Sequence, residues 1–240
     1  MRIVSLVPSW TEYLVDLGLE ADLVGRTKFC VRAGDHPERI ARIGGTKAIK
    51  VEQIEALQPD IVIASKEENV RAQVEACAAF SEVVLTDVRD VQGAFKALET
   101  VAESAGCKSQ GKRWRALTEA AWGNPKLPTS KAYYVIWHDP LMVAGRDTYI
   151  HSVMRWWGID NAIETTTRDR YPSLDVAQMK QSGCKQLLLS SEPYPFKAKH
   201  CKEFAAHGLK AHLVDGEAFS WYGSRMLHTA EYLSRIAAAV

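Results

Sequence analysis

A stretch near the C-terminus combines residue types that can hold a flat, anionic ligand. The segment VDGEAFSWYGSR, residues 214–225, carries Phe219, Trp221, Tyr222 and Arg225 around a glycine turn. Aromatic rings stack on flat apolar ligands, and a guanidinium group can donate two parallel hydrogen bonds to a carboxylate. The alternative is a surface turn whose rings cover a core, and the segment alone favours neither interpretation.

No pattern in the sequence indicates a known catalytic or metal centre. The chain lacks GxGxxG, GxxxxGK[ST], GxSxG and HExxH, which are typical of dinucleotide binding, phosphate binding, acyl transfer and zinc proteolysis. Its seven histidines show no spacing typical of metal ligands. We therefore predict no catalytic residue and no metal held directly by side chains.

Charge and composition exclude several classes of partner. The 30 basic and 29 acidic residues leave a net charge of +1, so nothing indicates binding to nucleic acid or to an anionic membrane. No apolar run approaches the roughly 20 residues of a membrane-spanning helix, and we expect no membrane insertion. The five cysteines form no CxxC pair, which favours a reducing compartment over a disulfide framework.

The first residues of the chain bear on its location. The sequence MRIVSLVPSW has neither the long apolar core nor the small-residue cleavage site of a signal peptide. We therefore expect a cytoplasmic location for the sequence as written. A periplasmic location is expected instead if an export signal has been trimmed from it.

Alternating apolar strands and amphipathic helices predict an α/β fold with parallel sheets. The expected strands span residues 2–7, 23–26, 61–64, 83–86, 132–136, 142–143, 186–189 and 212–214. The expected helices span residues 9–17, 51–57, 69–79, 91–105, 107–122, 148–157, 174–180, 196–206 and 225–238. Ser9 and Glu12 have the spacing of a capping box at the start of the first helix, whose backbone N–H groups could hold an anionic ligand group.

Two halves of the chain show a faint internal echo. Residues 56–69 and 180–193 both read as a helix end, a turn, an apolar strand, a serine and then a glutamate. Such an echo favours two similar α/β lobes over a single sheet. We predict an N-terminal lobe over 1–106, a connecting helix over 107–124 and a C-terminal lobe over 125–240.

Several segments of the chain resemble a known family. RIVSLVPSWTE, GRTKFC, GGTK and VEQIEALQPDIVIASKEEN resemble the N-terminal lobe of the class III periplasmic substrate-binding proteins, which include vitamin B12, iron–siderophore and haem receptors of ABC importers. VIWHDPLMVAGRDTYIHSVMRWWGIDNAI, RYPSLD, LLLSSEPYPF and VDGEAFSWYGSR resemble a leaderless subfamily of helical-backbone metal receptors. The resemblance implies two α/β lobes joined by one long backbone helix, with a ligand cleft between the lobes.

The resemblance also implies which side chains bind the ligand. They lie on loops that follow the strands and combine aromatic rings with charges. The implied ligand-binding residues are Ser9, Trp10, Glu12, Lys28, Phe29, Lys47, Lys66, Glu67, Trp137, His138, Arg170, Tyr171, Glu192, Tyr194, Phe219, Trp221, Tyr222 and Arg225.

The chain departs from the pattern of vitamin B12 importers at three aligned positions. Arg71 and Ser220 stand where those proteins carry the acidic residues that dock onto a permease, and Ser65 stands where they carry a tryptophan. The segment at Pro8 also lacks the histidine of the zinc and manganese receptors. An ABC permease remains the protein partner that the resemblance implies, without its usual docking acids.

Two functional hypotheses follow. The first is non-enzymatic binding of a small-molecule metal chelate, namely a corrinoid, haem or ferric siderophore, which is a ligand and not a covalently held cofactor. The alternative is a cytosolic enzyme of tetrapyrrole or metal-chelate metabolism on the same scaffold. Its acid–base candidates are Glu67, Glu192 and His138, with Cys30 as a candidate thiol.

Overall fold

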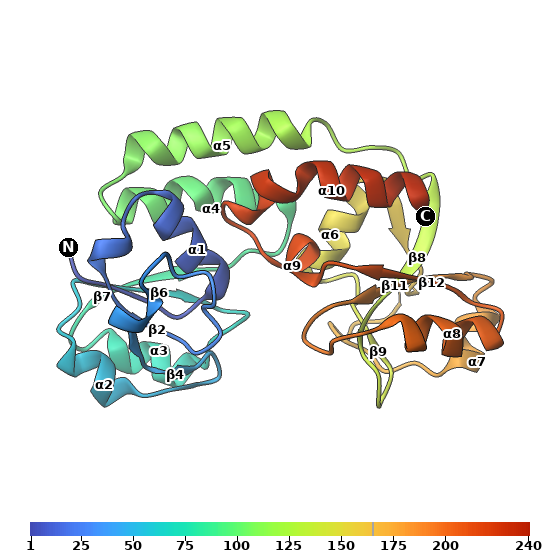
Figure 1. Ribbon diagram of the computed structural model, residues 1–240, viewed down its shortest axis with the longest axis horizontal. Coiled ribbons are helices and arrows are strands. Elements are labelled where there is room, and N and C mark those ends of the chain that lie inside the picture. Colours follow the sequence, from blue (N-terminus) through green and yellow to red (C-terminus); the bar gives the residue numbers. More distant parts are fainter. Residues whose placement is uncertain (165) are drawn as a thin grey trace. The chain divides into compact units, whose positions relative to one another are not determined.

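The computed structural model describes residues 1–164 and 166–240 and divides the chain into two compact units (Figure 1). The first unit comprises residues 1–88, 92–121 and 222–228, and the second comprises 89–91, 122–221 and 229–240. The boundaries expected from the sequence, at 106 and 124, stay a prediction. Among the described residues, no helix combines the length and apolar character needed to cross a membrane.

The first unit is built on a parallel sheet with the strand order β3-β2-β1-β6-β7. Its strands are β1 (Ile3–Ser5), β2 (Leu23–Arg26), β3 (Ala41–Arg42), β6 (Ile61–Ser65) and β7 (Glu82–Thr86). Every residue of β1 and β6 is buried, as expected for central strands that helices cover on both faces. A short antiparallel hairpin, β4 (Gly44–Gly45) with β5 (Ala48–Ile49), lies outside this sheet.

Helices cover both faces of the first sheet. They are α1 (Pro8–Asp16), α2 (Val51–Ala56), α3 (Arg71–Cys77), α4 (Val91–Ser104) and α5 (Lys108–Trp122). Figure 1 shows α2 and α3 below the sheet and α1 and α4 above it. The lower core joins Val4 and Val62 of the sheet to Ile54 of α2 and Val74 of α3. Alternation along each strand sends Ile3 and Ile63, both fully buried, to the opposite face.

The second unit repeats this plan. Its parallel sheet has the order β10-β8-β11-β12, and β9 pairs with β8 in antiparallel fashion. The strands are β8 (Ser130–Trp137), β9 (Met142–Val143), β10 (Ile159–Asn161), β11 (Gln186–Ser190) and β12 (Lys210–Val214). The helices are α6 (Tyr149–Trp156), α7 (Val176–Gln181), α8 (Ala198–Ala206) and α9 (Gly216–Ser220). Helix α10 (Arg225–Ala239) begins with residues of the first unit and continues into the second from residue 229. One core packs Met179 of α7 and Phe204 of α8 against Leu187 and Leu189 of the sheet.

The prediction of an α/β fold with parallel sheets is confirmed. The internal echo also corresponds to structure, because β6 lies between β1 and β7 in the first sheet and β11 lies between β8 and β12 in the second. The prediction missed β3, β4, β5, β10 and α9. These elements have two to five residues, too few to show a periodic pattern.

The predicted capping box at Ser9 and Glu12 is wrong. Helix α1 begins at Pro8, its N-cap residue is Val7, and no side chain caps it. Proline at the first helical position already removes one unpaired N–H group. The carboxylate of Glu12 is bound elsewhere, as described below.

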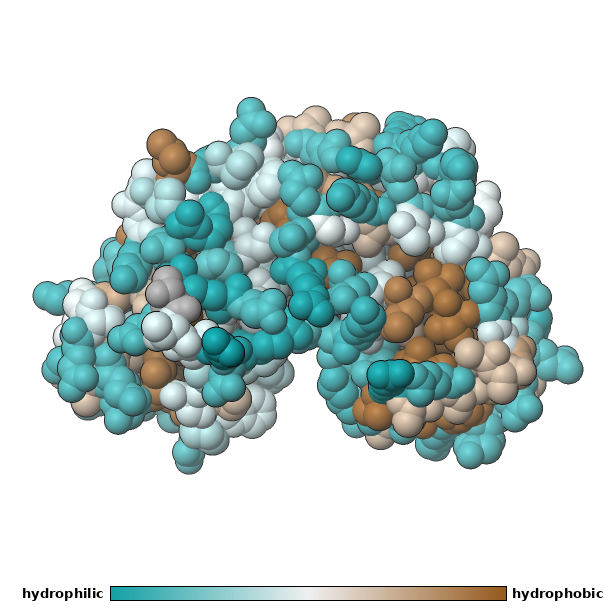
Figure 2. Space-filling view, turned by 180° about the vertical axis from the view of Figure 1, so that it is seen from behind, coloured by the Kyte–Doolittle hydropathy of each residue, from teal (hydrophilic) through white to brown (hydrophobic). Residues whose placement is uncertain are grey.

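Exposed apolar residues lie on one edge strand of each parallel sheet. Leu85 of β7 is 46% exposed and Leu213 of β12 is 44% exposed. Figure 2 shows hydrophobic surface gathered on one side of the first unit, at the right of that view. The loops considered next lie at the carboxyl ends of the strands, where ligands of parallel α/β proteins bind.

Candidate functional site

A buried serine ends strand β6 of the first unit and strand β11 of the second, and it organises the loop that follows. In the first unit, Ser65 Oγ accepts hydrogen bonds from the backbone N–H of Glu67 at 3.2 Å and from the hydroxyl of Tyr222 at 3.1 Å. In the second, Ser190 Oγ accepts from the backbone N–H of Glu192 at 3.3 Å and from the hydroxyl of Tyr134 at 3.1 Å. Each serine therefore fixes its loop in the same way, which gives the sequence echo a structural cause.

A surface of exposed lysines and one aromatic ring lies at the strand ends of the first unit. We call it the lysine surface and define it as Lys28, Phe29, Lys47, Lys66 and Glu67. The Nζ atom of Lys28 lies 4.9 Å from the centroid of the Phe29 ring, and Phe29 is 49% exposed. Lys47 Nζ donates to the backbone carbonyl of Glu67 at 2.6 Å, and Lys66 Nζ donates to Asp87 at 3.0 Å.

Asn69 ties the loop that carries Lys66 and Glu67 to the hairpin that carries Lys47. Its side-chain nitrogen donates to the carbonyls of Thr46, at 3.0 Å, and Leu6, at 3.3 Å, while its oxygen accepts from the N–H of Ser65 at 2.8 Å. Gly45 adds close packing, since a Cβ atom there would lie 3.3 Å from the ring of Phe29. The surface therefore rests on an ordered scaffold, which lowers the entropic cost of binding.

Three of the residues expected to bind ligand are instead buried inside the first unit. Trp10 is fully buried and its Nε1 donates to Thr86 at 3.0 Å. The Trp10 and Tyr222 ring centroids lie 4.8 Å apart, and burial raises the pKa of the Tyr222 hydroxyl above its ordinary value. Ser9 is only 4% exposed. Packing inside the first unit accounts for Trp10 and Tyr222.

Arg225 makes its bidentate contact with a protein carboxylate. Its Nε donates to Glu12 Oε2 at 3.0 Å and its terminal nitrogen donates to Glu12 Oε1. Glu12 is 8% exposed and Arg225 is 9% exposed. Burial raises the pKa of the Glu12 carboxyl, against the opposing charges of Arg225 and Arg32. This ion pair joins α1 to the start of α10, so the guanidinium that the sequence suggested for a ligand is engaged within the protein.

A second ion pair supports the same junction. His228 Nε2 lies 3.2 Å from Asp16 Oδ2. The hydrogen bond to Asp16 raises the pKa of His228. Burial acts to raise the pKa of Asp16, but the hydrogen bond and the charge of His228 act against it, and the net shift is downward. The pair therefore favours the charged forms of both groups.

The second unit carries a different cluster of rings at the end of β8. Trp137 is 39% exposed, and its ring centroid lies 5.6 Å from that of Tyr194. His138 stacks on Tyr194 at 5.5 Å with an interplanar angle of 18°, and its Nε2 lies 3.0 Å from a carboxylate oxygen of Glu203. Arg170 Nε donates to the carbonyl of Asp147 at 2.7 Å. Tyr171, the next residue along the chain, is half-buried.

Glu192 packs against Ser220 and Trp221 inside the second unit. Glu192 Oε1 accepts from Ser220 Oγ at 2.7 Å and from Trp221 Nε1 at 2.9 Å, and burial raises the pKa of this carboxyl. Phe219 is 1% exposed, and its ring packs 5.1 Å from that of Tyr134. Phe219 and Trp221 of the segment 214–225 are therefore packed inside the protein.

The structure thus divides the expected ligand-binding residues into three groups. Lys28, Phe29, Lys47, Lys66 and Trp137 are exposed, whereas Ser9, Trp10, Glu12, Phe219, Trp221, Tyr222 and Arg225 are buried. The remaining residues are partly buried, namely Glu67, His138, Arg170, Tyr171, Glu192 and Tyr194. The sequence analysis did not anticipate the roles of Asn69 and Gly216. A Cβ atom at Gly216 would lie 2.5 Å from Ser190 Oγ and from the side chain of Glu192. The Asp-Gly pair before α9 was the available signal for such a close approach.

Comparison with known proteins identifies the family. The periplasmic binding protein family model matches residues 3–212. An uncharacterised ABC transporter substrate-binding lipoprotein of Bacillus subtilis, YvrC, is 25% identical over 182 residues, which are 69% of this chain and 56% of that protein. The vitamin B12-binding protein of Vibrio vulnificus strain CMCP6 is 21% identical over 187 residues, covering 74% of this chain and 67% of that protein.

Solved structures show the same fold. The periplasmic haem-binding protein BhuT, in complex with two haems, superposes with a TM-score of 0.78 at 21% identity, over 99% of this chain and 98% of that one. The periplasmic vitamin B12-binding protein BtuF of Vibrio cholerae gives a TM-score of 0.77 at 15% identity, over 99% and 96% of the two chains. The chain belongs to the periplasmic binding protein family.

Proposed function

We propose that this protein binds a metal chelate, namely a corrinoid, haem or ferric siderophore, as the substrate-binding protein of an ABC importer. The family match and the names of the relatives support this assignment. The observation that carries it is the lysine surface, where Lys28 lies over the exposed ring of Phe29 and Lys47 contacts the loop that carries Lys66. Because the relatives are periplasmic or lipoproteins, the proposal favours a periplasmic location.

The chemistry of such chelates fits the exposed residues. Haem carries carboxylates, corrinoids carry a phosphate, and many ferric siderophores are anionic overall, so each offers charge to Lys28 and Lys47. The half-exposed ring of Phe29 offers an apolar face. Trp137, with Tyr194 behind it, offers another exposed ring in the second unit. We assign Glu12, Arg225, Trp10 and Tyr222 to holding the loops in place.

The proposal is tested by absorbance titration of the full chain with haem, cyanocobalamin and a ferric siderophore, each separately. Replacing Lys28 and Lys47 by glutamine should weaken the bound chelate by about tenfold or more, since each charge-assisted contact contributes on the order of 1 kcal/mol. Lys50→Gln, an exposed lysine of the same unit, is the matched control and should bind normally. Saturable binding that ignores Lys28 and Lys47 would remove the lysine surface from the proposal.

The enzyme hypothesis gains no support from the proposed acid–base residues. Internal contacts account for Glu192, bound by Ser220 and Trp221, and for His138, bound by Glu203. Cys30 is fully buried and burial raises the pKa of its thiol, which disfavours the reactive thiolate. We therefore propose binding without catalysis. A Glu192→Gln variant with unchanged chelate affinity is the expected result.

A further inference from the structure

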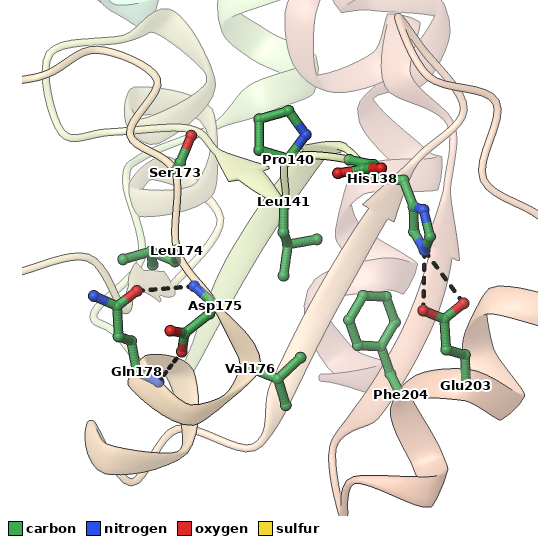
Figure 3. A pocket seen from close by; sticks show the side chains of 11 residues that line it. His138, Pro140, Leu141, Ser173, Leu174, Asp175, Val176, Gln178, Glu203 and Phe204 are labelled. Atoms are coloured by element: carbon green, nitrogen blue, oxygen red, sulfur yellow. Dashed lines mark hydrogen bonds and ion pairs between the residues drawn. The ribbon is translucent and has the colours of Figure 1, made fainter.

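The second unit contains a cavity of about 500 Å³ that the chelate proposal does not use. This volume is within the usual range for small-molecule pockets. Figure 3 shows Leu141, Val176 and Phe204 directed toward one another at its floor. Leu141 and Val176 pack against the core that includes Phe204, so the floor is continuous with the interior of the unit.

The walls of this cavity are joined by backbone hydrogen bonds. The N–H of Leu174 donates to the carbonyl of Leu141 at 2.9 Å, and a β-bridge pairs Met142 with Ser173. On one side, Asp175 caps α7 through the N–H of Gln178 at 2.7 Å. These bonds link the loop after β8 to the loop before α7. The cavity is therefore preformed, which favours ligand binding without a cost for ordering loops.

Three acidic residues line the cavity, namely Asp139, Asp175 and Glu203, together with one histidine, His138. Glu203 lies beside His138 on the far wall in Figure 3, and its two oxygens are 3.0 and 3.2 Å from His138 Nε2. Asp139 is exposed beside them. An apolar floor under a rim of carboxylates is complementary to a ligand with an apolar body and a cationic end.

We propose that this cavity binds a small organic cation, an amine with an aromatic or branched aliphatic body. The apolar body lies against Leu141, Val176 and Phe204, and the ammonium group pairs with Asp139 and Glu203. Nothing in this assignment depends on chelate binding, because neither carboxylate belongs to the lysine surface. A chelate titration and an amine titration therefore succeed or fail separately.

The test uses nuclear magnetic resonance of the isotopically labelled full chain, with 2-phenylethylamine as the probe. Saturable shifts should be concentrated at the backbone amides of 138, 139, 141, 173–178 and 203–204. The anionic analogue 3-phenylpropionate should bind about tenfold more weakly, since it meets carboxylates instead of pairing with them. Equal binding of the two probes would overturn the cationic assignment, and no saturable shift up to about 10 mM amine would overturn the site.

Variants of the two carboxylates test whether they bind the amine. Asp139→Asn and Glu203→Gln should each weaken amine binding by about three- to tenfold, as expected for the loss of one partly exposed charge pair. Glu52→Gln, which removes an exposed carboxylate of the first unit, is the matched control and should bind like the natural chain. If the control loses as much affinity as the rim variants, attraction to overall charge explains the binding, and the proposal is overturned.

Discussion

Removing the guanidinium of Arg225 should destabilise the first unit strongly. The Glu12 and Arg225 side chains are each 11% exposed, and breaking such a buried pair from one side typically costs about 3–5 kcal/mol. The Nε atom of Arg32 lies 3.9 Å from Glu12 and is partly solvated, so it partly compensates the orphaned carboxylate. We therefore expect Arg225→Met to lose about 3 kcal/mol, equivalent to roughly 6–12 °C for a chain of this size.

Urea unfolding monitored by circular dichroism measures this loss, and a double-mutant cycle assigns it to the pair. Glu12→Gln combined with Arg225→Met should be more stable than Arg225→Met alone, because the second change removes the unpaired buried charge that causes most of the loss. Folded Arg225→Met should keep the chelate affinity of the natural chain. If Arg225→Met loses less than about 1 kcal/mol and also loses chelate binding, the guanidinium contacts ligand and the assignment of Arg225 to the scaffold is wrong.

Three further predictions concern charge and packing. His228→Gln should lower the free energy of unfolding by less than about 1 kcal/mol, because the pair with Asp16 is half-exposed. Since folding raises the pKa of His228, this loss should be present below about pH 6 and should vanish as the pH rises through the raised pKa. Unfolding measured at several pH values checks it. Glu192→Gln should become more stable relative to the natural chain as the pH rises above about 4.5, because burial raises the pKa of this carboxyl and disfavours its ionised form. A difference in unfolding free energy that does not change with pH would contradict this. Gly216→Ala should lower the melting temperature by several degrees, because its Cβ atom would lie 2.5 Å from Ser190 Oγ and overpacking costs about 1–3 kcal/mol. An unchanged melting temperature in calorimetry would mean that the loop relaxes freely.

Local sequence patterns predicted most of the fold. Apolar runs such as Ile61–Ser65, bounded by turn residues, correspond directly to buried parallel strands. The two-residue strands at Ala41–Arg42 and Gly44–Gly45 could not be predicted, because two residues are too few to show a periodicity. The first depends on pairing with β2 and the second on a short hairpin with β5.

The candidate site was less predictable because it depends on which side chains face solvent. Phe29 and Phe219 look equally suitable in the sequence, yet one is 49% exposed and the other 1%. The partner of Arg225 lies 213 positions away along the chain, and no spacing rule links them. The false capping box at Glu12 has the same origin, since a long-range ion pair took the carboxylate that a local motif appeared to use.

The central claim is that the lysine surface binds an anionic metal chelate, and one titration tests it most directly. Haem, cyanocobalamin and a ferric siderophore are titrated into the natural chain and into Phe29→Ala, while the absorbance of the chelate is followed. We expect saturable binding of at least one chelate and an affinity about tenfold weaker in Phe29→Ala, as the loss of one stacked ring predicts. No binding of any of the three chelates at tens of micromolar, or equal affinity in Phe29→Ala, would contradict it.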